Sequence, residues 1–225
     1  MKKISVLLAD DHTVVREGFR ALLELETDLE IVGEASNGRQ AVELTMSLRP
    51  DVVVMDIAMP GLNGLEAAKR ISSAAPGTKV IILSMHSDDA YIEYIITLGL
   101  AGYLLKQTSS LILCRAIREV AKGNQFYSPA IARRVQQLSE YTGEKKSAFP
   151  ELSPREMEIL QLIAEGRANK QIATDLKISI KTVEKHRQNL MNKLDTHDTA
   201  RLTRYAISAG IIVTNERITL PYKDQ

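Results

Sequence analysis

The strongest constraint on the fold is the alternation, over the first 122 residues, of short apolar runs with longer stretches that have the period of an amphipathic helix. The apolar runs have the length of strands and lie at residues 4–9, 29–35, 51–56, 79–84 and 101–105. Helical patterns follow them, at residues 13–26, 37–48, 64–74, 88–99 and 109–123. Apolar strands joined by helical crossovers form a parallel sheet covered on both faces. The sequence therefore predicts a doubly wound α/β domain with five parallel strands.

The rhythm changes after residue 123. Residues 124–150 contain a short amphipathic stretch followed by TGEKKSAFP, which is polar, charged and typical of a linker. Residues 151–213 contain helical patterns only, enough for four short helices. We therefore expect a first domain at 1–123, a linker at 124–150, a second, smaller all-α domain at 151–213, and a C-terminal tail at 214–225.

Composition limits the location and the kinds of partner. Residues 1–124 carry 13 Lys/Arg and 16 Asp/Glu (net −3), whereas residues 125–225 carry 16 and 12 (net +4), which hints at different partners for the two halves. The single cysteine, Cys114, excludes an internal disulfide and fits a reducing compartment. No run approaches the ~20 apolar residues of a membrane span, and the N-terminal apolar run is too short for a signal peptide. We expect a cytoplasmic protein that does not associate with membranes.

Polar residues stand where the predicted strands end. Asp10 and Asp11 follow the first strand, Asp56 ends the third, Ser84 ends the fourth, and Lys106 lies just past the fifth. Ligands of open parallel sheets bind outside the carboxyl ends of the strands, so these side chains should converge. Three crowded carboxylates repel one another unless a cation intervenes. Mg²⁺ suits this setting, because it binds through one or two carboxylates together with water and phosphate oxygens.

These motifs closely resemble the flavodoxin-like receiver domain of bacterial response regulators. The resemblance covers residues 3–123 and is carried by DD at 10–11, MDIAMPGLNG around Asp56, IILSMHS around Ser84 and GYLLKQ around Lys106. It implies that Asp56 is the phosphoacceptor and receives its phosphoryl group from a sensor histidine kinase or a small phosphodonor.

The same resemblance implies the roles of the neighbouring residues. Asp10 and Asp11 would hold Mg²⁺, together with the Asp56 carboxylate and the backbone carbonyl of Ala58. Lys106 would pair with a phosphoryl oxygen, and Ser84 would hydrogen-bond the phosphoryl group. Tyr103 matches the aromatic residue that turns inward when that hydroxyl moves.

Residues 152–194 strongly resemble the LuxR-type helix-turn-helix of the NarL/FixJ class of response regulators. A short helix, a turn and a longer helix are expected, with the apolar side chains of Val183, Leu190 and Leu194 facing inward. A recognition helix of this kind enters the major groove of double-stranded DNA. By resemblance, the last helix of the domain forms the contact of a homodimer.

Seven residues of the longer helix are candidates for DNA binding. By resemblance, three of them occupy base-reading positions: Glu184, Lys185 and Gln188. Lysine can bond guanine, glutamine can pair with adenine, and glutamate can accept from cytosine. Four others would contact phosphates or set the orientation: Lys181, Thr182, His186 and Arg187.

The favoured hypothesis is a transcription factor and not a conventional enzyme. Phosphorylation of Asp56 by a histidine kinase would control dimerisation and sequence-specific DNA binding. Two alternatives stay open. One is a DNA-binding regulator whose receiver acts without phosphorylation. The other is a Mg²⁺-dependent phosphohydrolase with Asp56 as its nucleophile. Such enzymes usually place the nucleophile after the first strand with a second acid two residues on, whereas adjacent acids follow the first strand here.

Overall fold

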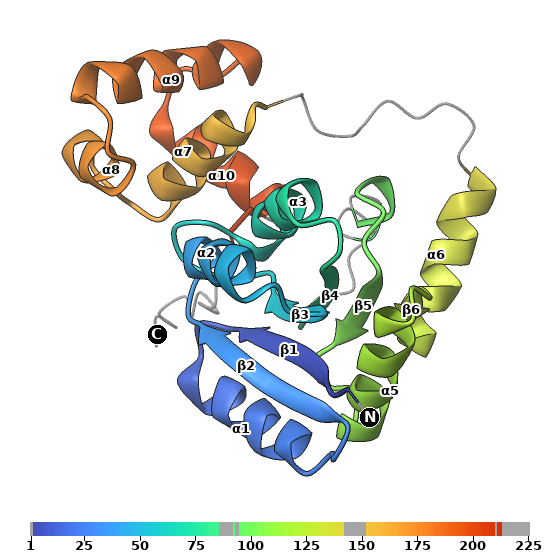
Figure 1. Ribbon diagram of the computed structural model, residues 1–225. Coiled ribbons are helices and arrows are strands. Elements are labelled where there is room, and N and C mark those ends of the chain that lie inside the picture. Colours follow the sequence, from blue (N-terminus) through green and yellow to red (C-terminus); the bar gives the residue numbers. More distant parts are fainter. Residues whose placement is uncertain (1, 86–91, 93–94, 142–151, 210, 213–225) are drawn as a thin grey trace, which may run out of the picture. The chain divides into compact units, whose positions relative to one another are not determined.

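The computed structural model describes residues 2–85, 92, 95–141, 152–209 and 211–212 (Figure 1). The chain divides into two compact units, residues 1–154 and residues 155–225. Among the described residues, we find no helical segment with the length and hydropathy of a membrane span.

The N-terminal unit is built on a parallel sheet with the strand order β2-β1-β3-β4-β5-β6. Its strands are β1 (Ile4–Ala9), β2 (Leu29–Ala35), β3 (Val52–Asp56), β4 (Lys79–Ser84), β5 (Gly102–Leu105) and β6 (Phe126–Tyr127). All five residues of β3 are buried, as expected for a central strand with helices on both sides. The predicted doubly wound α/β fold is confirmed, with one strand more than the five expected.

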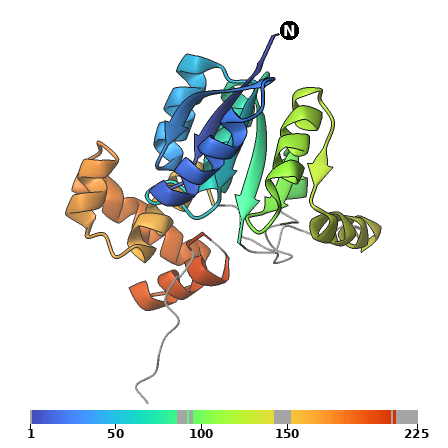
Figure 2. The ribbon, with the colours of Figure 1, turned by 90° about the horizontal axis from the view of Figure 1, so that it is seen from below.

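Helices cover both faces of the sheet (Figure 1; Figure 2). Helices α1 (Thr13–Glu24) and α5 (Ser110–Ala121) bury apolar side chains with one face, and α2 (Gly38–Leu48) and α3 (Gly64–Ala74) with the other. Asparagine side chains begin the second pair of helices: Asn37 Oδ1 accepts from Gln40 N at 2.9 Å, and Asn63 Oδ1 accepts from Glu66 N at 2.9 Å. Such caps satisfy backbone donors that have no partner within the helix.

The sixth strand and the helix α6 (Pro129–Tyr141) lie in the segment that the sequence predicts as a linker. Strand β6 pairs with β5, with Gly102 opposite Phe126, and Ile131 of α6 is fully buried in the core on the face of the sheet that α2 and α3 cover. Within the segment predicted as a linker, 124–150, residues 126–141 therefore form a strand and a helix, where the sequence indicates only a short amphipathic stretch. Half of the predicted helix at 88–99 lies outside the described residues, and residues 92 and 95–97 are helical. The tail at 214–225 and residues 142–151 lie outside the described residues.

The C-terminal unit is helical, as predicted. It contains α7 (Pro154–Ala164), α8 (Asn169–Asp175), α9 (Ile180–Lys193) and α10 (Thr199–Ser208). Its buried residues come from all four helices and include Ile159, Leu160, Ile172, Val183, Leu190 and Leu202. The Ser179 hydroxyl accepts from Thr182 N at 3.1 Å and caps α9. Val183 and Leu190 face inward as expected, so the opposite side of α9 is left to solvent.

Candidate functional site

The predicted acidic residues meet at one edge of the sheet. Strands β1 and β3 are neighbours in register, with Ala9 opposite Met55, so Asp10 and Asp56 follow side by side. Carboxylate oxygens of Asp10, Asp11 and Asp56 and a ring nitrogen of His12 lie within 4.8 Å of one another. The site lies where the connections from adjacent strands leave for opposite faces of the sheet, which is where such folds bind ligands.

Lys106, which directly follows β5, also belongs to this cluster. Its Nζ lies 2.8 Å from Asp10 Oδ2 and 2.8 Å from Asp56 Oδ2. The backbone N–H of Lys106 donates to the carbonyl of Ser84 at 2.8 Å, which anchors this residue to the end of β4. The lysine side chain is only 10% exposed, so solvent screens its two ion pairs little.

Burial and charge act in opposite directions on the two central groups. Burial raises the pKa of Asp56, and the negative charges of Asp10 and Asp11 add to this rise. The hydrogen bond and positive charge of Lys106 lower the pKa, but less than these effects raise it. Burial by itself would lower the pKa of Lys106, yet its bonds to Asp10 and Asp56 raise it above the usual value. Lys106 therefore keeps its charge at neutral pH and pairs with two of the three carboxylates, those of Asp10 and Asp56.

We expect Asp56→Asn to raise the midpoint of thermal unfolding at pH 7 without divalent cations. The pKa of Asp56 is higher in the folded protein than its ordinary value of 3.8, so the folded state binds more protons than the unfolded state. The free energy of unfolding therefore falls as pH rises from the ordinary pKa to the raised one. Asparagine removes that loss. The difference between variant and unaltered chain should shrink near pH 4, where Asp56 is increasingly protonated. A lower midpoint for the variant at pH 7 would show that the Lys106 pair outweighs burial.

A glycine allows the chain to pack closely behind Asp56. A side chain at Gly64 would collide with the carbonyl oxygen of Asp56, and the backbone N–H of Gly64 donates to the carbonyl of Ile57 at 2.9 Å. The start of α3 is thus held directly against the end of β3. This contact fixes the backbone that carries the Asp56 carboxylate.

Gly64→Ala should therefore lower the free energy of unfolding by about 1–3 kcal/mol, because the backbone on both sides must move apart. The matched control is Gly77→Ala, since no atom lies within 4 Å of a methyl group added there. Urea unfolding of both variants measures the effect. Equal stability of the two would show that the loop after Asp56 yields without strain.

The cluster fits a hard, oxygen-seeking dication. Asp11 Oδ1 is shielded from solvent and accepts no hydrogen bond from the described residues, although His12 Nδ1 lies 2.8 Å away. Such an oxygen has a free electron pair available to a metal ion. With Asp10 and Asp56, it gives the carboxylate set that Mg²⁺ prefers. Ala58, two residues after Asp56, is half-buried.

Ser84 and Tyr103 lie on the same side of the sheet. Ser84 pairs with Leu105 and Tyr103 pairs with Ile82, two residues earlier on each strand, so both side chains point to the face covered by α2 and α3. Ser84 is 1% exposed and is adjacent to the strand that ends in Asp56. Tyr103 is fully buried.

Two residues that sequence reasoning did not single out contact the acidic cluster. His12 Nδ1 lies 2.8 Å from Asp11 Oδ1 and 3.3 Å from Asp10 Oδ1. Arg16 donates to the carbonyl of Asp10 at 2.7 Å and to Glu34 Oε2 at 2.8 Å, which ties this loop to β2. The signal in the sequence was their spacing, because His12 directly follows the two acids and Arg16 lies one helical turn later.

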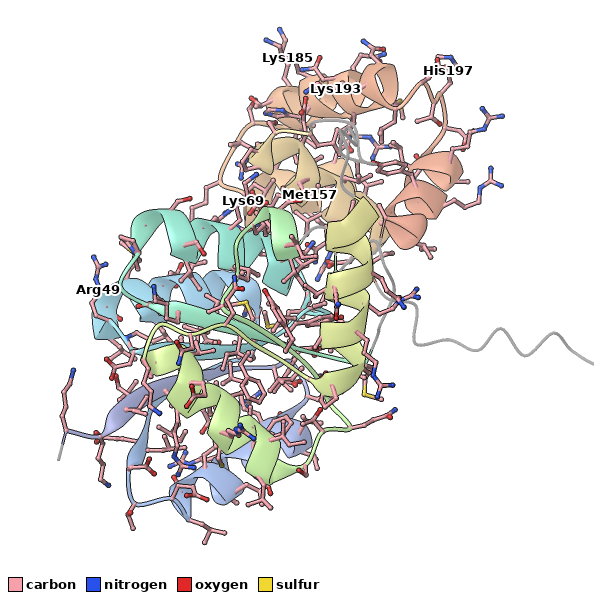
Figure 3. The ribbon with its side chains drawn as sticks, turned by 90° about the vertical axis from the view of Figure 1, so that its right-hand side faces the viewer. Arg49, Lys69, Met157, Lys185, Lys193 and His197 are labelled. Carbon is pink, nitrogen blue, oxygen red and sulfur yellow. The ribbon has the colours of Figure 1, made fainter. Side chains whose placement is uncertain are left out.

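The base-reading candidates on α9 are all exposed: Glu184, Lys185 and Gln188. Figure 3 shows Lys185 extending outward from its helix. Gln188 Nε2 donates to Asn192 Oδ1 at 3.1 Å along the same face. A continuous polar surface of this kind is what a helix presents to base edges.

The four remaining candidates are held differently. Lys181 is exposed, and the Thr182 hydroxyl lies 2.8 Å from the hydroxyl of Ser179 at the helix start. Half-buried His186 has its Nδ1 shielded and without a hydrogen bond to the described residues. Arg187 donates to Asn169 Oδ1 at 3.0 Å and to Thr199 Oγ1 at 2.9 Å. This side chain thus links α9 to the first residues of α8 and α10.

Two family models match this chain. The response regulator receiver domain matches residues 6–118, and the luxR family of bacterial regulatory proteins matches residues 150–206. The chain belongs to the response regulators of the NarL/FixJ class, which join a receiver domain to a LuxR-type DNA-binding domain.

Its relatives include the transcriptional regulatory protein LiaR of Bacillus subtilis, 41% identical over 203 residues, covering 90% of this chain and 96% of LiaR. The oxygen regulatory protein NreC of Staphylococcus haemolyticus is 38% identical over 217 residues, covering 93% and 99% of the two chains. Among solved structures, RcsB of Salmonella typhimurium is 29% identical with a TM-score of 0.57, covering 92% and 100%. A complex of RcsB with DNA is 29% identical with a TM-score of 0.58, covering 92% and 99%. LiaR and NreC are both named as regulatory proteins.

Proposed function

We propose that a sensor histidine kinase phosphorylates Asp56, and that this modification promotes a homodimer which binds double-stranded DNA through α9 and regulates transcription in the cytoplasm. The observation that carries the proposal is the position of Lys106 Nζ, 2.8 Å from a carboxylate oxygen of both Asp10 and Asp56. A lysine that already contacts the Asp56 carboxylate is well placed to pair with the phosphoryl group that Asp56 would acquire.

Phosphoryl transfer requires positioning and charge neutralisation more than covalent help from the protein. A carboxylate oxygen of Asp56 attacks the phosphorus of the donor phosphohistidine, the new P–O bond forms, and the P–N bond breaks with its electron pair going to the leaving imidazole. Lys106 pairs with one phosphoryl oxygen. Mg²⁺ held by Asp10, Asp11, Asp56 and the carbonyl of Ala58 would neutralise further charge on the phosphoryl group.

The phosphoryl group adds negative charge and acceptor oxygens at the end of β3. The Ser84 hydroxyl, on the adjacent strand, donates to one of these oxygens. Tyr103 lies on the same face of the sheet, so its inward position is favoured once the hydroxyl has moved. Phosphorylation thereby shifts an existing equilibrium toward the state competent for dimerisation.

The C-terminal unit supports the DNA-binding part of the proposal through its exposed polar surface. Glu184, Lys185 and Gln188 would read base edges, while Lys181 and Thr182 would contact phosphates. His186 and Arg187 would set the orientation of the recognition helix α9 in the major groove. A dimer with two-fold symmetry would place two recognition helices about 34 Å apart, one turn of DNA. The complex of the related RcsB with DNA makes this mode of binding a reasonable expectation for this chain.

Selection of DNA sites from a random pool, at one stated salt concentration, tests the proposal. The full chain is used with and without beryllofluoride, which mimics the phosphoryl group. We expect enrichment of a two-fold symmetric sequence, with markedly stronger binding in the presence of the mimic. Recovery of the same sites at the same affinity in both states would favour a receiver that acts without phosphorylation. Salt must be fixed, because phosphate contacts make affinity strongly salt-dependent.

A further inference from the structure

His12 brings a nitrogen to a site otherwise lined by oxygen. Its Nδ1 lies 2.8 Å from Asp11 Oδ1 and 3.3 Å from Asp10 Oδ1. It belongs to the same group of ligand atoms as Asp56, all within 4.8 Å of one another. The imidazole is thus directed into the acidic cluster and not away from it.

The local backbone explains why the His12 imidazole is available to bind a metal ion. His12 precedes the first residue of α1, but its side chain makes no hydrogen bond that caps the helix. Its backbone N–H donates to Asp10 Oδ1 at 2.9 Å, which holds the residue beside the carboxylates. The side chain is 50% exposed, so the ring can adjust its position without disturbing the core.

The spacing of the ligand atoms suits a common metal ion. Two ligands bound at right angles, each about 2.1 Å from one ion, lie about 3 Å apart. The separations of 2.8 and 3.3 Å from His12 Nδ1 to the two carboxylate oxygens bracket that value. A carboxylate pair with one imidazole is a ligand set that transition-metal dications accept, whereas Mg²⁺ favours oxygen alone.

We propose that His12 is a nitrogen ligand at this site, and that it raises the affinity of the receiver for first-row transition dications such as Co²⁺ relative to that for Mg²⁺. The inference rests on the proposed function, because the ion would occupy the place assigned there to Mg²⁺. Affinity for a mixed nitrogen and oxygen site rises from Mn²⁺ through Co²⁺ to Ni²⁺. With His12 as a ligand, the affinity rises more steeply along this series than it would with the carboxylates alone. The competing explanation is that a protonated His12 only forms an ion pair with the acids.

Calorimetric titration of the full chain with MgCl₂ and CoCl₂ separates the two explanations. His12→Asn should lower the affinity for Co²⁺ about tenfold or more, and should change the affinity for Mg²⁺ far less. The matched control is His197→Asn, in the C-terminal unit, which should leave the ratio of the two affinities unchanged. An unchanged ratio in His12→Asn would overturn the proposal.

Pulsed electron paramagnetic resonance of the Mn²⁺-loaded chain gives a second, direct measurement. A coupling between Mn²⁺ and a ¹⁴N nucleus is expected for the unaltered chain and should disappear in His12→Asn. The same experiment on His86→Asn is needed, because His86 follows Ser84 by two residues in the sequence. Persistence of the coupling in His12→Asn, or its loss in His86→Asn alone, contradicts the proposal.

Failure of this inference can be told apart from failure of the proposed function. Phosphorylation of the unaltered chain by acetyl phosphate with Mg²⁺, mapped to Asp56 by mass spectrometry, tests the proposed function. If Asp56 is phosphorylated and the Co²⁺ to Mg²⁺ ratio does not depend on His12, only the present inference is wrong. If neither Co²⁺ nor Mg²⁺ binds, the inference about His12 and the proposed function are both wrong.

Discussion

Replacing Asp56 with asparagine is expected to abolish phosphoryl uptake, with a rate about a thousandfold or more below that of the unaltered chain. The amide is uncharged and a poor nucleophile, while its shape is nearly the same as that of the carboxylate. The side chain is 4% exposed, and no other carboxylate of the cluster ends a strand. Intact mass after incubation with acetyl phosphate and Mg²⁺ measures the uptake of one phosphoryl group.

Asp51→Asn is the matched control for this experiment. Asp51 directly precedes the other end of the same strand, where its Oδ2 accepts from Ser5 N at 2.8 Å and from Ser5 Oγ at 2.7 Å. An asparagine oxygen can still accept these bonds, so uptake should continue at the normal rate. Phosphorylation of Asp56→Asn at the normal rate, or a normal response of that variant to beryllofluoride, would mean that another residue is the acceptor.

The second large effect is expected in the C-terminal unit, from changing Glu184, Lys185 and Gln188 together to alanine. Each good contact with a base edge contributes about 1–3 kcal/mol of discrimination. Loss of all three should lower the ratio of specific to non-specific affinity by at least about 100-fold. Binding of the selected site and of a scrambled sequence, both measured by fluorescence anisotropy at one salt concentration, gives this ratio.

Lys181→Ala provides the contrasting result. This exposed residue is expected to contact phosphate, so its loss should weaken binding to both sequences about equally. The slope of log affinity against log salt should fall by about 1. If the triple variant also weakens both sequences equally, its three side chains contact the DNA backbone and the base-reading assignment is wrong.

The acidic site could be predicted because topology alone brings its members together. Asp10, Asp56 and Lys106 are far apart in the sequence, yet each stands at the end of a parallel strand or directly after it, and parallel strands end at one edge. The distances between these side chains could not be predicted from the sequence. It did not indicate that Lys106 Nζ lies 2.8 Å from carboxylate oxygens of both Asp10 and Asp56. It also did not indicate that His12 turns toward the same cluster.

The remaining differences arise from contacts that leave no periodic signal. Strand β6 has only two residues, too few to show an alternating pattern, and the polar residues after it favoured a linker. Arg187 was placed near DNA by its position on the recognition helix. Its partners, Asn169 and Thr199, are 18 and 12 residues away in the sequence. Only the packing of three helices brings them within reach.

The short strand β6 determines where the chain can be cut. Its flanking backbone bonds, Phe126 N to Ala101 O at 2.9 Å and Ser128 N to Tyr103 O at 3.0 Å, close the free edge of β5. A fragment that stops at residue 123 would leave that edge open and lose Ile131 from the core. Open edges pair with other molecules and promote aggregation. During synthesis, the receiver likewise completes its sheet only after residues 126–127 have left the ribosome.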